Sequence, residues 1–386
     1  MQELMIITSY FPPEIGAASN RIYHLANGLT SHYNVRVVTP LPNYPTGKIF
    51  SEYKGNFSSK AIEENIEVNR IWIYASKSKN KFIRLFAMLS YSFSLIWFFI
   101  WNKIPNKVIV QSPPLLVAFT CMFFLRSKKR KLILNVSDLW PSAGYELGAL
   151  KKNLSYKILK QLEVFNYKNA DLILGQSNEI LSHIEKITKK PDLFLYRNYP
   201  NIERPVIIEN SSENNKLKIV YAGLLGVAQG ILKLCQNLNY DTIELHIYGS
   251  GAEENEIKAF VKANSNLSIF FYGRIDRKEL HKALLKYDVA IIPLLNRIYG
   301  SVPSKIFEYA KLGLPMLYFG GGEGETIIKE YDLGWIAEVG NYNHLNSTIR
   351  LMDLSSNGIE RKREIQDKAF ENFNFDKQLA SLIEIL

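Results

Sequence analysis

Short apolar runs alternate along this chain with longer segments in which apolar residues recur at helical spacing. Residues 4–9 and 34–39 have the pattern of buried strands, and residues 18–30 between them have the pattern of a helix. The second half repeats this arrangement, with a helix at 280–286 followed by a continuous apolar strand at 288–293. Such strands, separated by helices, are typical of parallel sheets covered on both faces. The pattern therefore predicts an α/β fold.

Length and one polar stretch predict two domains. A chain of 386 residues is long enough for about two domains of roughly 150–200 residues each. Residues 200–215 are polar and contain prolines, as expected for a linker. We therefore place a first domain at residues 1–200 and a second at 201–362.

Residues 302–315 carry the most informative candidate chemistry. Ser304 and Lys305 lie at the start of a predicted helix, where free backbone N–H groups bind anions, and Glu308 follows one turn later. A cation and amides suit a phosphate, and a carboxylate suits ribose hydroxyls. Together they predict a site for a phosphorylated sugar, with an ordinary helix whose polar face is solvated as the alternative.

The preceding segment favours the binding site. Arg274 ends a short predicted strand that begins at Phe270, and Lys305 follows the strand at 288–293. Ligands of parallel α/β sheets bind beyond the carboxyl ends of the strands. Both cations are therefore predicted at that edge.

Positive charge is concentrated in the first half of the chain. Residues 1–200 contain 26 Lys and Arg against 13 Asp and Glu, whereas the remaining residues contain 21 against 24. A basic half suits nucleic acid or an anionic membrane surface. Basic runs at 77–84, 126–131 and 151–160 accompany an aromatic helix, so we expect a membrane surface and no nucleic acid.

The aromatic helix at residues 82–101 allows three interpretations. Its length and single charge could suit a membrane span. Three serines dilute it, however, and it lies between strands of one domain. We favour a helix packed on the sheet whose aromatic flank contacts lipid headgroups. A fully buried helix and an integral membrane protein are the alternatives.

The remaining composition predicts a cytoplasmic protein without cofactor or metal. The chain starts with an apolar strand rather than a basic leader. Cys121 and Cys235 lie far apart in apolar runs, as expected for small core residues in a reducing compartment. The six histidines show no ligand spacing, so no metal site is predicted.

Several motifs, in this order and spacing, resemble the retaining glycosyltransferases of family 4, which have the GT-B fold. Among these, the chain is most similar to the bacterial polysaccharide branch with an Asp-Leu-Trp-Pro motif. The resemblance covers nearly the whole chain. It rests on residues 10–18 (YFPPEIGAA), 112–114 (SPP), 137–141 (SDLWP), 220–223 (VYAG), 247–251 (IYGSG), 273–274 (GR) and 303–315 (PSKIFEYAKLGLP).

The resemblance implies two Rossmann-like domains that face a central cleft, with residues 363–386 as a C-terminal helix that packs back on the first domain. It implies transfer of a hexosyl or N-acetylhexosaminyl group, with retention, from a nucleoside diphosphate sugar. That sugar is a co-substrate, and no metal is required. The expected acceptor is a hydroxyl of a glycan that is carried on a polyprenyl diphosphate at the inner face of the cytoplasmic membrane. The expected product is a bacterial surface polysaccharide such as lipopolysaccharide or capsule.

In the first domain, the resemblance points to three residues. Backbone amides at Gly16 and Ala17 would approach the donor diphosphate, although a simple strand-to-helix turn also explains them. Asp138 would line the acceptor or the transferred sugar as a catalytic residue, with a cap of the next helix as the alternative.

In the second domain, the resemblance assigns Gly223, Arg274, Ser304 and Lys305 to the donor and Glu308 to the ribose, as both a donor-binding and a catalytic residue. Three positions depart from the family pattern. Leu224 and Gln229 stand where many relatives carry a cation, and Gly300 replaces the first of two paired glutamates; Glu323 and Glu325 are candidates to replace it. A non-catalytic nucleotide-sugar-binding module is therefore the alternative function.

Overall fold

The computed structural model divides the chain into two compact units. Unit 1 comprises residues 1–198 and 376–386, and unit 2 comprises residues 199–375. The structure describes residues 1–78, 80–207, 216–295, 298–352 and 358–386. Residues 208–215 of the predicted linker lie outside the described residues.

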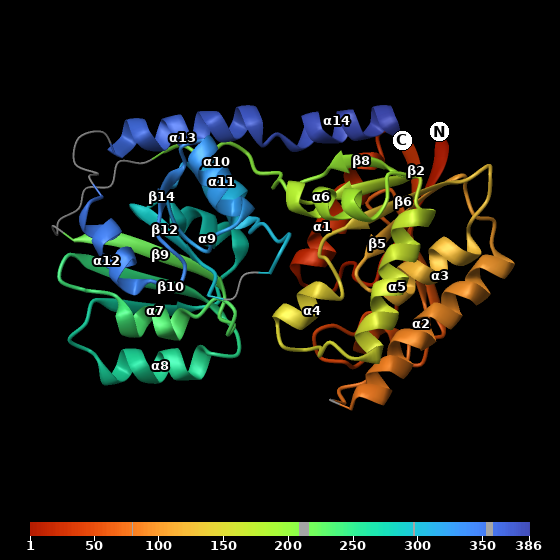
Figure 1. The fold of residues 1–386 in the computed structure, drawn as a ribbon, viewed down its shortest axis with the longest axis horizontal. Coiled ribbons are helices and arrows are strands. Elements are labelled where there is room, and N and C mark those ends of the chain that lie inside the picture. The colour runs from red at the N-terminus through yellow and green to blue at the C-terminus, as the bar shows by residue number, and fades with distance from the viewer. Residues whose placement is uncertain (79, 208–215, 296–297, 353–357) are drawn as a thin grey trace. The chain divides into compact units, whose positions relative to one another are not determined.

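Unit 1 is built on an eight-stranded sheet with the order β3-β4-β2-β1-β5-β6-β7-β8. Figure 1 labels β2, β5, β6 and β8 of this sheet. Its strands are β1 (Gln2–Ile7), β2 (Tyr33–Pro40), β3 (Ser58–Glu63), β4 (Ile66–Ile71), β5 (Lys107–Ser112), β6 (Lys131–Val136), β7 (Leu172–Gly175) and β8 (Asp192–Leu195). Neighbouring strands are parallel except for β3, which pairs antiparallel with β4 at the edge. Residues 4–7 of β1 are fully buried, as the continuous apolar run predicts.

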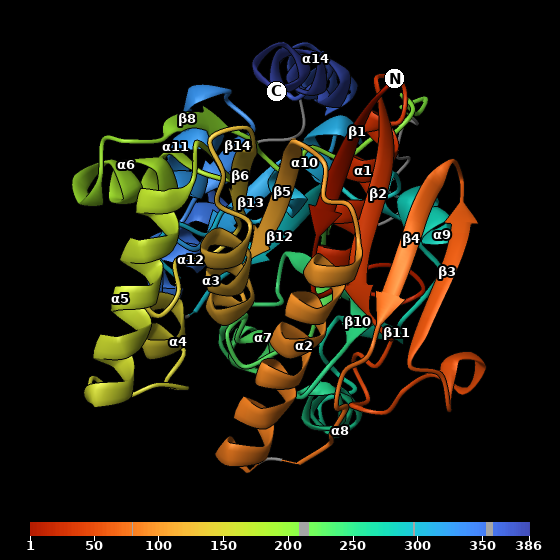
Figure 2. The same ribbon diagram turned by 90° about the vertical axis from the view of Figure 1, so that its right-hand side faces the viewer.

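Helices connect these strands and cover the sheet. They are α1 (Ala17–Leu29), α2 (Lys81–Trp101), α3 (Leu115–Phe124), α4 (Ser142–Glu146), α5 (Leu154–Asn169) and α6 (Asn178–Ile187), with a 3₁₀ turn at Ser51–Tyr53. Helix α3 packs between α2 and α5, and Figure 2 shows the three helices on one side of the sheet.

Helix α2 is partly buried in unit 1. Tyr91, Leu95 and Phe98 are buried, and the hydroxyl of Tyr91 donates a hydrogen bond of 2.8 Å to the carbonyl of Thr8 in the turn after β1. In the described part of the chain, no helix is long and apolar enough to cross a membrane. These contacts favour the packed helix among the three interpretations of residues 82–101.

Unit 2 contains a six-stranded parallel sheet with the order β11-β10-β9-β12-β13-β14. Its strands are β9 (Leu217–Leu224), β10 (Ile243–Ser250), β11 (Ile269–Gly273), β12 (Val289–Pro293), β13 (Met316–Phe319) and β14 (Gly334–Ile336). One face packs against α9 (Arg277–Leu284), α10 (Lys305–Lys311), α11 (Glu323–Glu330) and α13 (Gly358–Asn372). The other packs against α7 (Ile231–Asn237), α8 (Glu254–Ala263) and α12 (Tyr342–Arg350). Together with unit 1, this sheet confirms the predicted α/β class.

The C-terminal segment differs from the single helix predicted at 363–386. It forms two helices, α13 and α14 (Phe375–Ile385), and residues up to 375 belong to unit 2. Helix α13 stays there because Lys362 donates a hydrogen bond of 2.8 Å to the carbonyl of Tyr287 and Ile365 is fully buried. Gln378 of α14 exchanges two hydrogen bonds, of 2.8 and 3.0 Å, with the backbone of Arg197 in unit 1.

Two glycines let β9 and β10 approach closely at their carboxyl ends. Gly223 pairs with Gly249, whose φ is +147°, and a Cβ at Gly249 would lie 1.8 Å from the carbonyl oxygen of Gly223. We expect Gly249→Ala to destabilise unit 2 by at least about 2 kcal/mol, because strain and a backbone clash add up. The melting temperature should fall by at least about 4 °C. Gly358→Ala is the control, since among the described residues no atom outside its own helix backbone and chain neighbours lies within 4 Å of a Cβ there. Equal melting temperatures for the two variants would contradict this explanation.

Candidate functional site

One lysine of α10 lies across the carboxyl end of β9. A Cβ atom at Gly223 would lie 2.7 Å from Cε and 3.3 Å from Nζ of Lys305. Because Gly223 has no side chain, the side chain of Lys305 can occupy this space. The structure brings together two of the predicted site residues, which are far apart in the sequence.

The environment of Lys305 suits an anion. Its side chain is half-buried, and Nζ lies 5.3 Å from the centre of the Tyr309 ring. Burial lowers the pKa of Lys305, the negative charge of Glu308 raises it, and the positive charge of Arg277 lowers it further. An ammonium group that is partly withdrawn from water attracts a phosphate more strongly, because the interaction is screened less.

Glu308, in the first turn of α10, is held by two side chains of α9. Its Oε1 lies 2.7 Å from Nε2 of His281 and 3.4 Å from Nη2 of Arg277. Burial alone would raise the pKa of Glu308, but the hydrogen bond from His281 and the charges of Lys305 and Arg277 lower it to about 2. The ionised carboxylate must accept, so Nε2 of His281 donates. Neither His281 nor Arg277 is among the site residues predicted from the sequence.

Arg274 is exposed. It lines an open pocket of about 470 Å³ together with Ile275, Asp276, Arg277 and Leu280. Arg277 borders the pocket and also contacts Glu308, so the pocket adjoins the carboxylate.

Helix α10 is shorter than residues 302–315 predict. It spans seven residues from Lys305, and Ser304 is its N-cap residue, whose hydroxyl caps no backbone amide. The helix ends as expected, since Gly313 has a φ of +70°, which favours glycine.

The structure places two of the three positions that depart from the pattern implied by the resemblance. Leu224 is 65% exposed at the end of β9, and Gly300 has a φ of +84° in a turn. Of the two candidate replacements for the first glutamate, Glu325 forms an ion pair of 2.7 Å with Lys329 on the surface of α11. Glu323 is buried at the start of the same helix and remains the candidate.

In unit 1, the segment at Gly16 is fixed by a buried carboxylate. Oε1 of Glu14 accepts hydrogen bonds from the backbone N–H groups of Asn43 and Tyr44, at 2.7 and 2.8 Å. Gly16 is the N-cap residue of α1 and Ala17 is its exposed first residue. The backbone of Gly16 is extended, with a φ of 172°, so its conformation does not require glycine. The close approach of a ligand stays a prediction for these two residues.

Asp138 lies two residues beyond β6, close to an arginine that the sequence analysis missed. Burial raises the pKa of Asp138, and the positive charge of Arg21 lowers it. Nε of Arg21 is buried and has no hydrogen-bond partner among the described residues. The sequence contains one feature that could have pointed to Arg21, since it is the only charged residue of α1.

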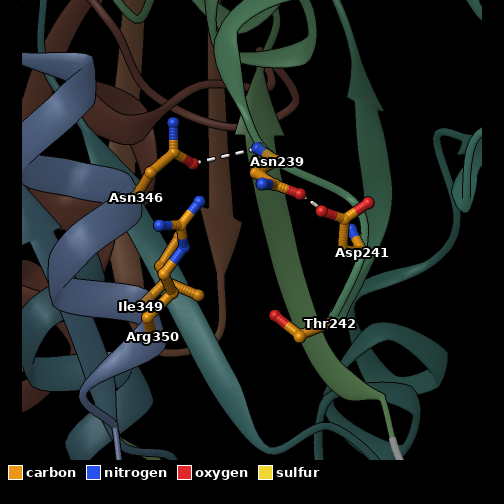
Figure 3. Close-up of a pocket in the computed structure, with 6 residues that line it drawn as sticks. All are labelled: Asn239, Asp241, Thr242, Asn346, Ile349 and Arg350. Atoms are coloured by element: carbon orange, nitrogen blue, oxygen red, sulfur yellow. Dashed lines mark hydrogen bonds between the residues drawn. The ribbon is translucent and has the colours of Figure 1, made fainter.

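Two further features of the structure concern possible metal ligands and a second cavity. Within the described ranges, no three His, Cys, Asp or Glu side chains come together as potential metal ligands. A pocket of about 160 Å³ lies between α12 and the amino end of β10, lined by Asn239, Asp241, Thr242, Asn346, Ile349 and Arg350 (Figure 3). In it, Oδ1 of Asn346 accepts a hydrogen bond of 2.9 Å from the amide of Asn239. It lies at the opposite end of the sheet from Lys305.

The lowered pKa of Glu308 predicts a pH-dependent contribution to stability. The contribution is fully present above the ordinary carboxyl pKa of 4.5 and is lost as the pH falls towards about 2. The difference in unfolding free energy between wild type and Glu308→Gln should therefore be constant above pH 6 and shrink by about 2 kcal/mol by pH 3. Urea titrations at several pH values measure it. A difference that does not change with pH would contradict the ionised, hydrogen-bonded state of Glu308.

Part of the chain is similar in sequence to known proteins. Residues 205–370 match the sequence model of a family described as glycosyl transferases group 1. The chain is 26% identical over 303 residues to the probable glycosyltransferase WbjE of Pseudomonas aeruginosa, covering 73% of this chain and 75% of that protein.

Solved structures support the fold. The HepE protein of Anabaena, in complex with UDP and glucose, matches with a TM-score of 0.68 and 12% identity over 100% of both chains. WaaG, a glycosyltransferase involved in lipopolysaccharide biosynthesis, matches with a TM-score of 0.66 and 11% identity over 99% of both chains. The chain therefore has the GT-B fold, and its residues 205–370 match the glycosyl transferases group 1 family.

Proposed function

We propose that the protein is a glycosyltransferase that moves a sugar from a nucleoside diphosphate sugar to a hydroxyl group of a glycan. The observation that carries this proposal is the position of Lys305 at the carboxyl end of β9, where Gly223 has no side chain. The ionised carboxylate of Glu308 follows one turn later on α10. Both lie within the residues that match the glycosyl transferases group 1 family. A cation and a carboxylate at the carboxyl end of a parallel sheet suit the diphosphate and the ribose of such a donor.

Each site residue has a role in this proposal. Lys305 and Arg274 bind the diphosphate and stabilise it as the leaving group, and Glu308 accepts hydrogen bonds from the ribose hydroxyls. Amides at Gly16 and Ala17 add donors to the diphosphate, and Ser304 and Gly223 border the donor. These roles need no metal ion.

Asp138 is proposed to line the acceptor or the transferred hexosyl or N-acetylhexosaminyl group. Its partial burial beside Arg21 supports a role in a site rather than on the surface. By the resemblance to family 4, transfer proceeds with retention.

The proposed acceptor is a glycan of a bacterial surface polysaccharide, held on a polyprenyl diphosphate. The Asp-Leu-Trp-Pro motif and the structural similarity to WaaG support this choice. The enzyme would then work at the inner face of the cytoplasmic membrane, as a peripheral protein on the cytoplasmic side.

A surface of unit 1 supports the membrane proposal. Helices α2 and α3 both return from the carboxyl to the amino ends of the strands, so their C-terminal ends lie at one end of the sheet. There α2 exposes Trp97 and Trp101, which are 66% and 69% exposed, and α3 exposes Phe123 and Phe124. The basic run 126–131 follows directly. We call these four aromatic residues and this run the basic-aromatic face.

One observation supports the alternative function, a non-catalytic nucleotide-sugar-binding module. An exposed leucine at position 224, where relatives carry a cation, leaves fewer positive charges for the leaving diphosphate. Release of free nucleoside diphosphate in the presence of a matched acceptor distinguishes the two functions, since a binding module releases none.

We expect Lys305→Ala to weaken binding of a nucleoside diphosphate about tenfold to a hundredfold, because a charge-assisted contact contributes about 1.5–3 kcal/mol. Calorimetry with UDP and GDP measures the affinity. Lys329→Ala is the matched control, since Lys329 is an exposed lysine on another helix of unit 2. Unchanged affinity in Lys305→Ala would remove this residue from the donor site.

We expect the protein to bind vesicles that contain anionic lipid, and salt to release it. Each basic residue near such a surface contributes about 1 kcal/mol, which fades within a Debye length. Sedimentation should show weaker binding for Lys128→Glu/Lys129→Glu and for Trp97→Ser/Trp101→Ser. Phe270→Ser, an exposed aromatic residue of unit 2, is the control. Equal binding to neutral and anionic vesicles would contradict the electrostatic part.

A further inference from the structure

Among the described residues of unit 2, partners are found for one of the two oxygens of Glu308. Oε1 accepts from Nε2 of His281 at 2.7 Å and lies 3.4 Å from Nη2 of Arg277. The part of the chain that the structure describes offers no hydrogen-bond partner to Oε2. The side chains of Glu308 and His281 are 17% and 18% exposed, so the pair is partly withdrawn from water but still reachable.

We propose that His281, assisted by Arg277, is a positioning residue that holds Glu308 by one oxygen and leaves the other for the ribose hydroxyls of the donor nucleotide. This inference rests on the proposed function and adds a second helix, α9, to the donor site. His281 acts through Glu308 and needs no contact with the sugar that is transferred.

The contact also separates Glu308 from the lysine on its own helix. Lys305 and Glu308 are three residues apart on α10, a spacing at which opposite charges commonly pair. No ion pair within 4.0 Å joins them among the described residues; Lys305 lies over Gly223 instead. Because α9 holds Glu308, the carboxylate does not neutralise Lys305, and the cation remains available for phosphate.

A fixed carboxylate also lowers the entropic cost of binding. A free glutamate side chain samples many rotamers, and ordering it on binding weakens the affinity. This matters more here because Gly300 replaces the other glutamate of the family pattern. The remaining carboxylate contact to the donor must then come from a side chain that is already in place.

The test compares a nucleotide with its 2′-deoxy analogue. Calorimetry on the full chain uses UDP or GDP, whichever binds more tightly, and the corresponding 2′-deoxynucleotide. Wild type should prefer the ribonucleotide roughly tenfold, the value of one hydrogen bond to a charged group. His281→Ala should reduce this preference to about twofold or less, while affinity for the 2′-deoxynucleotide changes little.

Three further variants make the result specific. His281→Gln, whose amide can donate from a similar position, should restore most of the preference. Lys305→Ala should weaken both nucleotides equally and keep the preference. Lys278→Ala, an exposed lysine on α9, should behave as wild type.

Two outcomes would overturn the inference without touching the proposed function. A preference that is unchanged in His281→Ala would mean that Glu308 is placed without α9. Equal weakening of both nucleotides, with a lower melting temperature, would make the contact a structural link between α9 and α10. In contrast, a wild-type chain that binds neither UDP nor GDP would contradict the proposed function itself.

Discussion

The close approach of β9, β10 and α10 is the constraint on which the candidate site depends. Gly223 and Gly249 leave no side chain between the two strand ends, and the long side chain of Lys305 enters the space above them. The hydroxyl of Tyr309 donates a hydrogen bond of 3.0 Å to the carbonyl of Ala222, which ties α10 to β9. The charged residues of α10 therefore cannot move independently of the sheet, and a ligand meets them in a fixed arrangement.

Local patterns predicted the elements of this site but not its contacts. Helical spacing predicts the apolar stripe of α10, in which Ile306, Phe307 and Ala310 are buried. Gly313 predicts the end of the helix. The link between Glu308 and His281 joins two helices, and nothing in either segment indicates that they meet. Such pairs depend on how helices pack on the sheet, which the sequence pattern does not specify.

The same reason explains why α2 allowed three interpretations. Its sequence is apolar on nearly all sides, so periodicity does not tell the inner from the outer face. In the structure Ser90 and Ser92 lie on the buried face, whereas Trp97 is exposed. Ser90 fits inside because its hydroxyl accepts from the amide of Tyr74 at 2.9 Å and donates to the carbonyl of Ala87 at 2.7 Å. Small hydroxyl-bearing residues let the helix approach the core beside the buried Tyr91 and Phe98, whereas Trp97 and Trp101 are exposed.

The two units differ in net charge, because the excess of Lys and Arg lies in unit 1. This difference suits two kinds of anionic partner. Unit 2 has no excess of positive charge, so it can attract an anion only where single cations are placed, as at Lys305. Unit 1 has a large excess of positive charge beside exposed indole and phenyl rings, which suits a broad surface rather than a point ligand. A small anion is recognised by geometry and a membrane by summed charge and apolar area. The proposed transfer from a dissolved donor to a lipid-held acceptor would require both kinds of recognition, which is why the charge of each unit bears on the proposal.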